Sequence, residues 1–202
     1  MHGLLDILIA QAQSWTMLEA VAVLFAVLYL VLAIRENILC WLCAGISTAI
    51  YIYLFLNARL YMESALNVFY FAMAIYGWRV WYQGRSDERA MPVGVWVTSI
   101  HAKAIAAIMA LSLVSGYLLS RYTDAAFPYV DSLTTWGAMW ATFLVARKVL
   151  ENWWYWLVID IASILIYWSR DLQLTSLLFV AYVIMIPFGL IRWKRSWRES
   201  HA

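Results

Sequence analysis

Seven long apolar blocks, separated by short charged connections, constrain this chain more than any other feature. The blocks cover residues 15–34, 38–56, 61–81, 102–119, 128–146, 152–168 and 175–193. As helices, they are long enough to cross a hydrocarbon core of about 30 Å. The chain is 65% hydrophobic and 13% charged, whereas a soluble protein averages about 45–50% and 25%. The sequence therefore predicts an all-α integral membrane protein with seven transmembrane helices.

Other classes of protein do not fit this composition. Aromatic residues make up 17% of the chain, the net charge is +2 and there are two cysteines, which argues against disorder, a nucleic-acid partner and a disulfide scaffold. A membrane β-barrel would show short segments of alternating polarity instead of continuous apolar blocks. The bilayer is therefore the environment in which this chain is expected to fold.

The distribution of basic residues predicts an orientation. Of the 14 Lys and Arg residues, we place only Arg59, Arg121 and Arg170 on the side opposite the C terminus, which leaves 11 on the C-terminal side. Because Lys and Arg are retained in the cytoplasm, we expect a cytoplasmic C terminus and an external N terminus in a bacterial inner membrane. Residues 1–14, which contain no Lys or Arg, are then an extracytoplasmic segment and not a signal peptide.

The first three predicted helices resemble the last three. A shift of 112 residues superposes Glu19 on Asp131, Arg35 on Arg147, Tyr70 on Tyr182 and Gly77 on Gly189. In the middle helix, a shift of 115 superposes Trp41 on Trp156. The pattern predicts two parallel three-helix repeats, 15–82 and 121–195, joined by a cytoplasmic loop and a linker helix within 83–120. Residues 196–202 form a cytoplasmic tail. Parallel repeats are typical of transporters that bind substrate between the two units.

Asp160 is the strongest candidate for a functional residue. It lies halfway along its apolar block, where an ionisable side chain is costly, and no Lys or Arg lies at a comparable depth. A cationic substrate would supply the missing partner; a structural acid bonded to a neighbouring helix is the alternative. Asn152, Trp156 and Tyr167 share a helical face with Asp160. This face predicts part of a substrate site, with Trp156 stacking on the ligand.

Polar and aromatic residues of other faces complete the predicted substrate site: Trp153, Trp41, Asn37, Thr48, Tyr51, Asn67, Tyr70 and Thr135. For Trp153 an interfacial anchor is the alternative, and for Asn37 and Asn152 a helix cap is. We interpret Glu19, Asp131 and Glu63 as structural or gating acids. Cys40 and Cys43 are expected to be buried thiols. We expect no metal site, no cofactor and no enzymatic activity, because the chain contains none of the common catalytic or nucleotide-binding motifs.

Several of these residues fall in a recognisable pattern: Asp131-Ser132, Thr134-Thr135-Trp136 and Arg147-Lys148-x-x-Glu151-Asn152-Trp153-x-x-Trp156. This pattern resembles the signature of the PnuC family of vitamin transporters, and the resemblance extends over nearly the whole chain. It implies a fold of three, one and three helices and a homotrimer with one pathway per protomer. It also implies facilitated diffusion of a vitamin, which cytoplasmic phosphorylation then traps.

The resemblance leaves the choice of vitamin open. Nicotinamide riboside members of the family can carry Asn where this chain has Asp160, so the acid is more similar to the thiamine branch. We therefore expect a cationic vitamin and favour thiamine, with nicotinamide riboside as the alternative. Two other classes compete with a transporter. One is an intramembrane enzyme that pairs Asp131 with Asp160, and the other is a membrane scaffold without a ligand.

Overall fold

The computed structural model describes residues 16–57, 61–84, 91–169 and 173–201. This part of the chain contains seven α-helices: α2 (Met17–Ile34), α3 (Leu39–Asn57), α4 (Tyr61–Gln83), α5 (Thr98–Tyr122), α6 (Pro128–Ala146), α7 (Asn152–Ser169) and α8 (Gln173–Ser200). Each helix coincides with a predicted apolar block to within a few residues at most ends, and α8 continues to Ser200. The all-α prediction is confirmed. The predicted external segment 1–14 lies outside the described residues.

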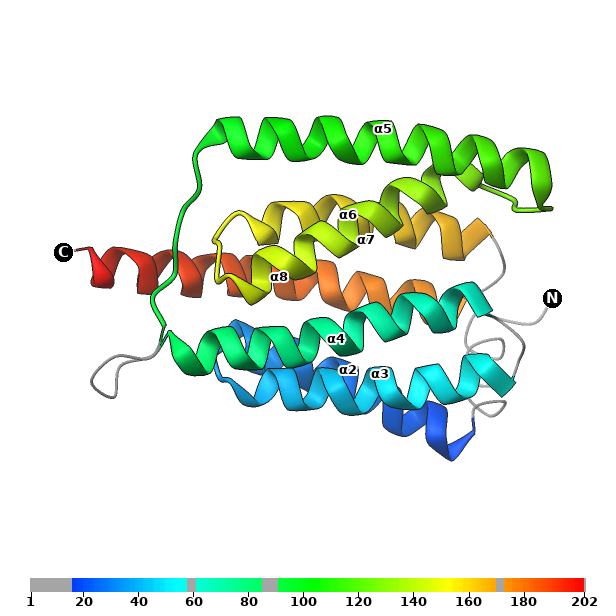
Figure 1. The fold of residues 1–202 in the computed structure, drawn as a ribbon. Helices are drawn as coiled ribbons and strands as arrows, with labels where there is room; N and C mark the ends of the chain where they lie inside the picture. Colours follow the sequence, from blue (N-terminus) through cyan, green and yellow to red (C-terminus); the bar gives the residue numbers. More distant parts are fainter. Residues whose placement is uncertain (1–15, 58–60, 85–90, 170–172, 202) are drawn as a thin grey trace.

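The helices form a bundle in which neighbours along the chain pack against one another. Helix α3 contacts both α2 and α4, and α7 contacts both α6 and α8. Helix α5 packs on α6 at the edge of the bundle, and the two groups of three meet where α4 contacts α6 and α2 contacts α8. Figure 1 shows that α2 and α6 run in the same direction, as do α3 and α7, and α4 and α8.

Four of the seven described helices are long and apolar enough to cross a membrane by length and composition alone. These are α2, α3, α5 and the Thr175–Ser200 part of α8. The other three helices carry polar residues within their apolar blocks, such as Asn67 in α4, Thr135 in α6 and Asp160 in α7. Polar residues are expected on helices that face one another instead of lipid.

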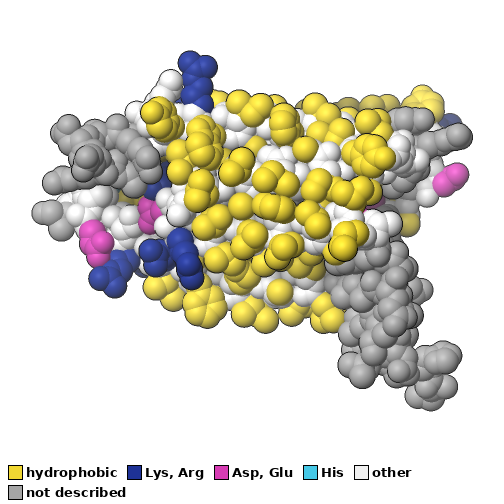
Figure 2. Space-filling view, turned by 90° about the horizontal axis from the view of Figure 1, so that it is seen from below, with side chains coloured by type: hydrophobic (Ala, Val, Ile, Leu, Met, Phe, Trp, Pro, Cys, Tyr) yellow, Lys and Arg dark blue, Asp and Glu magenta, His cyan; other side chains and the backbone are white. Residues whose placement is uncertain are grey.

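The outer surface fits a membrane environment. Figure 2 shows an almost continuous apolar belt, with Lys and Arg gathered at the end of the molecule that carries the C terminus. Side chains such as Val158, Leu165 and Ile191 are about two-thirds exposed, which a soluble protein would avoid over so wide an area. The chain is therefore described as a multi-pass membrane protein, and its orientation in the bilayer stays a prediction.

The turns after α2 and α6 have the same backbone geometry. Glu36 and Lys148, the described non-glycine residues with positive φ, have φ values of 56° and 52°. In the first turn, Glu36 N donates to Ala33 O and Asn37 N to Leu32 O; in the second, the corresponding donors are Lys148 N and Val149 N. Both turns are Schellman motifs, which usually place glycine at the left-handed position.

The middle helices of the two groups correspond at a shift of 112 residues, and the predicted shift of 115 is wrong. Trp41 packs over Gly77 and Trp153 packs over Gly189, so close that a Cβ atom at either glycine would overlap the indole. Trp153, not Trp156, is therefore the counterpart of Trp41. Trp153 and Trp156 both lie near the start of α7, so the sequence leaves either as a possible counterpart of Trp41, and only packing distinguishes them.

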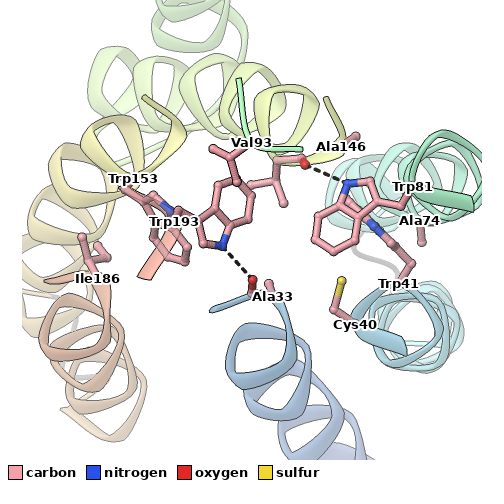
Figure 3. Close-up of a cluster of buried hydrophobic side chains, with 11 residues drawn as sticks. Ala33, Cys40, Trp41, Ala74, Trp81, Val93, Ala146, Trp153, Ile186 and Trp193 are labelled. Carbon is pink, nitrogen blue, oxygen red and sulfur yellow. Dashed lines mark hydrogen bonds between the residues drawn. The ribbon is translucent and has the colours of Figure 1, made fainter. Parts of the chain in front are cut away.

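Four tryptophans form the centre of the main hydrophobic core, near the end of the bundle where α2 and α6 finish (Figure 3). Trp41 lies edge-on to Trp81, with ring centroids 5.6 Å apart, and Trp153 lies edge-on to Trp193 at 5.4 Å. These four tryptophans belong to a buried core that we call the tryptophan cluster. Its other members are Ala33, Cys40, Ala74, Val93, Val145, Ala146 and Ile186. Cys40 and Cys43 are buried free thiols, as predicted.

Candidate functional site

A cavity of about 150 Å³ lies beside the tryptophan cluster, between α2 on one side and α7 and α8 on the other. Its lining residues are mostly apolar or aromatic: Ala26, Tyr29, Leu30, Ala33, Val145, Asn152, Trp153, Trp156, Asp160, Phe179, Tyr182 and Ile186. A cavity of this size accommodates one aromatic ring. Helices from both three-helix groups supply its walls.

Asp160 is the one acidic or basic residue among the described residues that line the cavity. Its side chain is 4% exposed, and within the described residues no hydrogen bond reaches its carboxylate. Tyr182, on α8, is close enough to interact electrostatically with this carboxylate. A carboxylate in this position, surrounded by aromatic rings, is suited to bind a planar cation, because both the negative charge and the ring faces attract it.

Two other lining residues present unpaired polar atoms. The Nδ2 atom of Asn152 donates to Val149 O at 2.7 Å, which fixes the amide orientation, whereas Oδ1 has no partner among the described residues. The indole Nε1 of Trp153 is also unpaired there. Leaving a buried acceptor and a buried donor unsatisfied is unfavourable. A ligand that carries a donor and an acceptor of its own would relieve this cost.

The structure brings together four of the predicted site residues and adds others that the sequence did not reveal. Asn152, Trp153, Trp156 and Asp160 all line the cavity. Tyr29, Phe179 and Tyr182 form the rest of the aromatic wall. Tyr182 had a weak signal in its match to Tyr70 in the repeat, but Tyr29 lies within an apolar run of α2 and had none.

Predicted polar residues on the first group of helices lie outside this cavity. The side chain of Asn37 accepts a hydrogen bond from Leu39 N at 2.9 Å, which is a local helix-start interaction. Thr48 Oγ1 donates to Ala44 O at 2.8 Å, and Asn67 Nδ2 donates to the backbone of its own helix at 2.9 Å. These three side chains satisfy local backbone groups. Thr135 is half-buried on α6.

The remaining aromatic candidates take different positions. Trp41 belongs to the tryptophan cluster. Tyr70 and Trp156 both pack against a small second core of Ala138, Ala141 and Ile159. Two further candidates stack on phenylalanines: Tyr51 on Phe55 at 5.4 Å and Tyr167 on the lining residue Phe179 at 5.3 Å.

The three acids interpreted as structural or gating residues occupy equivalent positions on three different helices. Glu19, Asp131 and Glu63 each lie in the first turn of a helix, namely α2, α6 and α4. Glu19 completes a capping box with Thr16, whose hydroxyl accepts a hydrogen bond from Glu19 N at 3.2 Å. An acidic side chain at such a position stabilises the positive end of the helix dipole. Asp131 does not line the cavity with Asp160.

The tryptophan cluster closes the cavity toward the end of the bundle that carries the C terminus. Four residues belong to this cluster and also line the cavity: Ala33, Val145, Trp153 and Ile186. Beyond them, Trp81 and Trp193 fill the space between the two groups of helices, as Figure 3 shows. These residues form the floor of the cavity.

Comparisons with known proteins agree with this description. A family model described as nicotinamide mononucleotide transporter matches residues 16–195. The nicotinamide riboside transporter PnuC of Escherichia coli strain K12 is 26% identical over 211 residues, covering 92% of this chain and 87% of that protein. The riboflavin/roseoflavin transporter RibM of Streptomyces davaonensis is 27% identical over 133 residues, covering 64% and 62%.

A solved structure has the same fold. The crystal structure of the vitamin B3 transporter PnuC superposes with a TM-score of 0.72 and 23% sequence identity, covering 96% of this chain and 90% of that one. At this level of identity, the match establishes the arrangement of the helices.

Proposed function

The chain belongs to the nicotinamide mononucleotide transporter family, and from that premise we propose that it carries nicotinamide riboside across the membrane. Relatives from Escherichia coli and Neisseria mucosa that match 92% and 90% of the chain are named nicotinamide riboside transporters. These relatives support nicotinamide riboside ahead of thiamine, so the preference drawn from the sequence is reversed. A protein that binds a vitamin at this site has no need of a catalytic step.

The observation that carries this proposal is the Asp160 carboxylate in an otherwise uncharged cavity. The pyridinium ring of nicotinamide riboside carries a fixed positive charge, which would pair with the carboxylate in surroundings of low polarity. Coulomb attraction between such charges is much stronger there than in water. Riboflavin, which is neutral, would not gain this interaction.

The same charge favours the riboside over its phosphorylated form. A phosphate group would add negative charge next to Asp160, and no Lys or Arg is among the described residues that line the cavity. Phosphate sites normally depend on basic side chains or helix N-termini. The nucleoside is therefore the better fit to the cavity, even though the family description mentions the mononucleotide.

The cavity walls suggest how the riboside is held. The cavity volume of about 150 Å³ suits one aromatic ring. We therefore place the pyridinium ring there, against Trp156 and near Tyr29 and Tyr182. The carboxamide offers an NH₂ donor and a carbonyl acceptor, which complement Asn152 Oδ1 and Trp153 Nε1. The ribose then extends from the cavity toward the end of the bundle opposite the floor.

We further propose that transport is facilitated diffusion and that phosphorylation in the cytoplasm traps the product. Three expectations from the sequence belong to this proposal: the two parallel three-helix repeats, the homotrimer, and the external N terminus with a cytoplasmic C terminus in a bacterial inner membrane. The positively charged end of the molecule in Figure 2 supports the orientation.

Uptake into liposomes that contain only the purified protein tests the function. We expect uptake of nicotinamide riboside down its gradient, without ATP, and little uptake of the mononucleotide or riboflavin. Thiamine is included as a second cation, because Asp160 would also attract its thiazolium ring. Selective uptake of thiamine would restore the interpretation drawn from the sequence, and absence of uptake of every vitamin would refute the proposal.

A further inference from the structure

An ion pair between a buried lysine and a partly buried glutamate joins the two groups of helices beyond the cavity floor. Lys148, which is 1% exposed, donates from Nζ to Glu36 Oε2 at 2.7 Å and to Met91 O at 2.7 Å. Its ammonium group also lies 4.9 Å from the centre of the Trp81 ring. Ser196 Oγ donates to the same Glu36 oxygen at 3.2 Å. Segments from both groups and from the loop before α5 therefore meet at this pair.

The backbone pays a conformational cost to place these two side chains. Glu36 and Lys148 occupy the left-handed position of their Schellman turns, where glycine avoids the steric penalty. Residues kept in such a conformation often have a functional role. Here the advantage of a side chain over glycine is direct, because each residue supplies one half of the ion pair.

Two tryptophan hydrogen bonds reinforce the same interface from both sides. Trp193 Nε1 donates to Ala33 O at 3.0 Å, and Trp81 Nε1 donates to Val145 O at 3.2 Å. Each tryptophan thus binds the end of a helix in the other group, and both bonds are drawn in Figure 3. The accepting carbonyls belong to Ala33 and Val145, which line the cavity.

We propose that Glu36 and Lys148 form the lock of a gate, which closes the cavity toward the end of the bundle that carries the C terminus. The gate consists of this ion pair and the floor tryptophans Trp81 and Trp193. The pair is broken when the two groups of helices separate at this end, and the two tryptophan bonds are lost with it. The cavity then opens toward the C-terminal side and releases the ligand.

The physical reason for a charged lock is its all-or-none character. A buried ion pair is stable only while both partners are in place, because removing one leaves an unpaired charge in an apolar environment. Water that enters when the helices separate solvates both charges and lowers the cost of the open state. An apolar contact of the same size would expose apolar surface to water when the gate opens and would gain no such compensation.

Thiol accessibility from the two sides of the membrane tests the lock. Ala26, a cavity residue on α2, is replaced by cysteine in a Cys40→Ala, Cys43→Ala background. The modification rate is then measured with a charged thiol reagent in vesicles of both orientations. A separate Ser200→Cys protein identifies the C-terminal side. We expect Glu36→Gln and Lys148→Met each to raise the rate from that side at least tenfold.

Two further variants make the result specific. Glu199→Gln breaks the exposed Arg195–Glu199 pair on α8, with N–O distance 2.7 Å, and should leave the rate unchanged. The exchanged pair, Glu36→Lys with Lys148→Glu, restores the ion pair but not the bond to Met91 O or the contact with the Trp81 ring. It should therefore bring the rate back toward that of the parent protein. If the two single variants fold and react as slowly as the parent protein, the lock is refuted.

The exchanged pair also decides the case in which both single variants fail to fold. A folded exchanged protein with the slow rate then supports the lock, and one with a fast rate or no fold overturns it. The readout does not depend on which vitamin is carried. Failure of nicotinamide riboside uptake with a positive accessibility result would therefore refute the proposed substrate and leave the gate standing.

Discussion

Trp153 lies edge-on to Trp193, with their ring centroids 5.4 Å apart and their planes at 86°. This contact makes Trp153 part of the cavity floor, together with its close packing over Gly189. Trp156, one turn further along α7, is only partly buried and packs at the edge of the two hydrophobic cores. The two tryptophans of the W-x-x-W pattern thus differ in their surroundings.

The two tryptophans should therefore respond differently to truncation. Trp156→Ala should weaken vitamin binding by about 1–3 kcal/mol, because burial and cation–π attraction are lost. Trp153→Ala should lower the free energy of unfolding by about 3–5 kcal/mol, as is usual for a core tryptophan, and should cost binding only the single hydrogen bond from Nε1, about 0.5–1.5 kcal/mol. Calorimetric titration and thermal unfolding separate the two effects. Unchanged affinity in Trp156→Ala would remove this residue from the site.

Asp160 should distinguish ligands by charge. Asp160→Asn keeps the shape of the side chain and removes the charge, so affinity for nicotinamide riboside should fall by about 2–5 kcal/mol, as expected when one member of a buried charge pair is removed. Binding of the uncharged, reduced form of the riboside should change much less. Titrations of both ligands against both proteins measure this difference.

Glu63→Gln is the matched control for the Asp160 variant, because Glu63 is an exposed acid in the first turn of α4. It should leave both affinities unchanged. If Asp160→Asn reduces the affinity for the two ligands equally, the carboxylate has a structural role and the charge argument for a cationic vitamin fails.

Asn152 should recognise the carboxamide of the ligand. Its unpaired Oδ1 can accept from an NH₂ group, and nicotinic acid riboside has no such donor. The native protein should therefore bind nicotinamide riboside more tightly, and Asn152→Leu should lose about 0.5–1.5 kcal/mol of that preference, the value of one hydrogen bond. Competition binding with the two ribosides measures it. Asn67→Leu, whose amide bonds only its own helix, is the control.

The glycines beneath the tryptophans should be intolerant of a methyl group. A Cβ atom at Gly77 would overlap Trp41, and one at Gly189 would overlap Trp153. Each Gly→Ala change should lower the free energy of unfolding by about 1–3 kcal/mol, the usual cost of overpacking. Gly94→Ala is the control, because nothing lies within 4 Å of a Cβ atom there. Thermal unfolding of the three proteins compares them, and equal stability would contradict the close packing.

The helices and the face of α7 that lines the cavity could be predicted from the sequence. Burial in lipid requires every backbone group of a spanning segment to bond within the segment, so the apolar blocks alone locate α2 to α8. Helical periodicity then places Asn152, Trp156 and Asp160 on one face of α7. Both inferences depend on neighbouring residues only, and these are what a sequence displays.

Tertiary packing decided the rest. In the sequence, Lys148 lies in the short charged connection between two apolar blocks, which gives no sign that it is buried. Only the approach of the two helix groups buries it against Glu36. Tyr29 lines the cavity because α2 lies beside α8, and nothing in its own segment distinguishes it from its apolar neighbours. Likewise, Trp41 corresponds to Trp153 because of the glycines that they cover. Such relationships arise between residues far apart in the chain, where shape complementarity and the pairing of charges select among partners that local patterns leave equivalent.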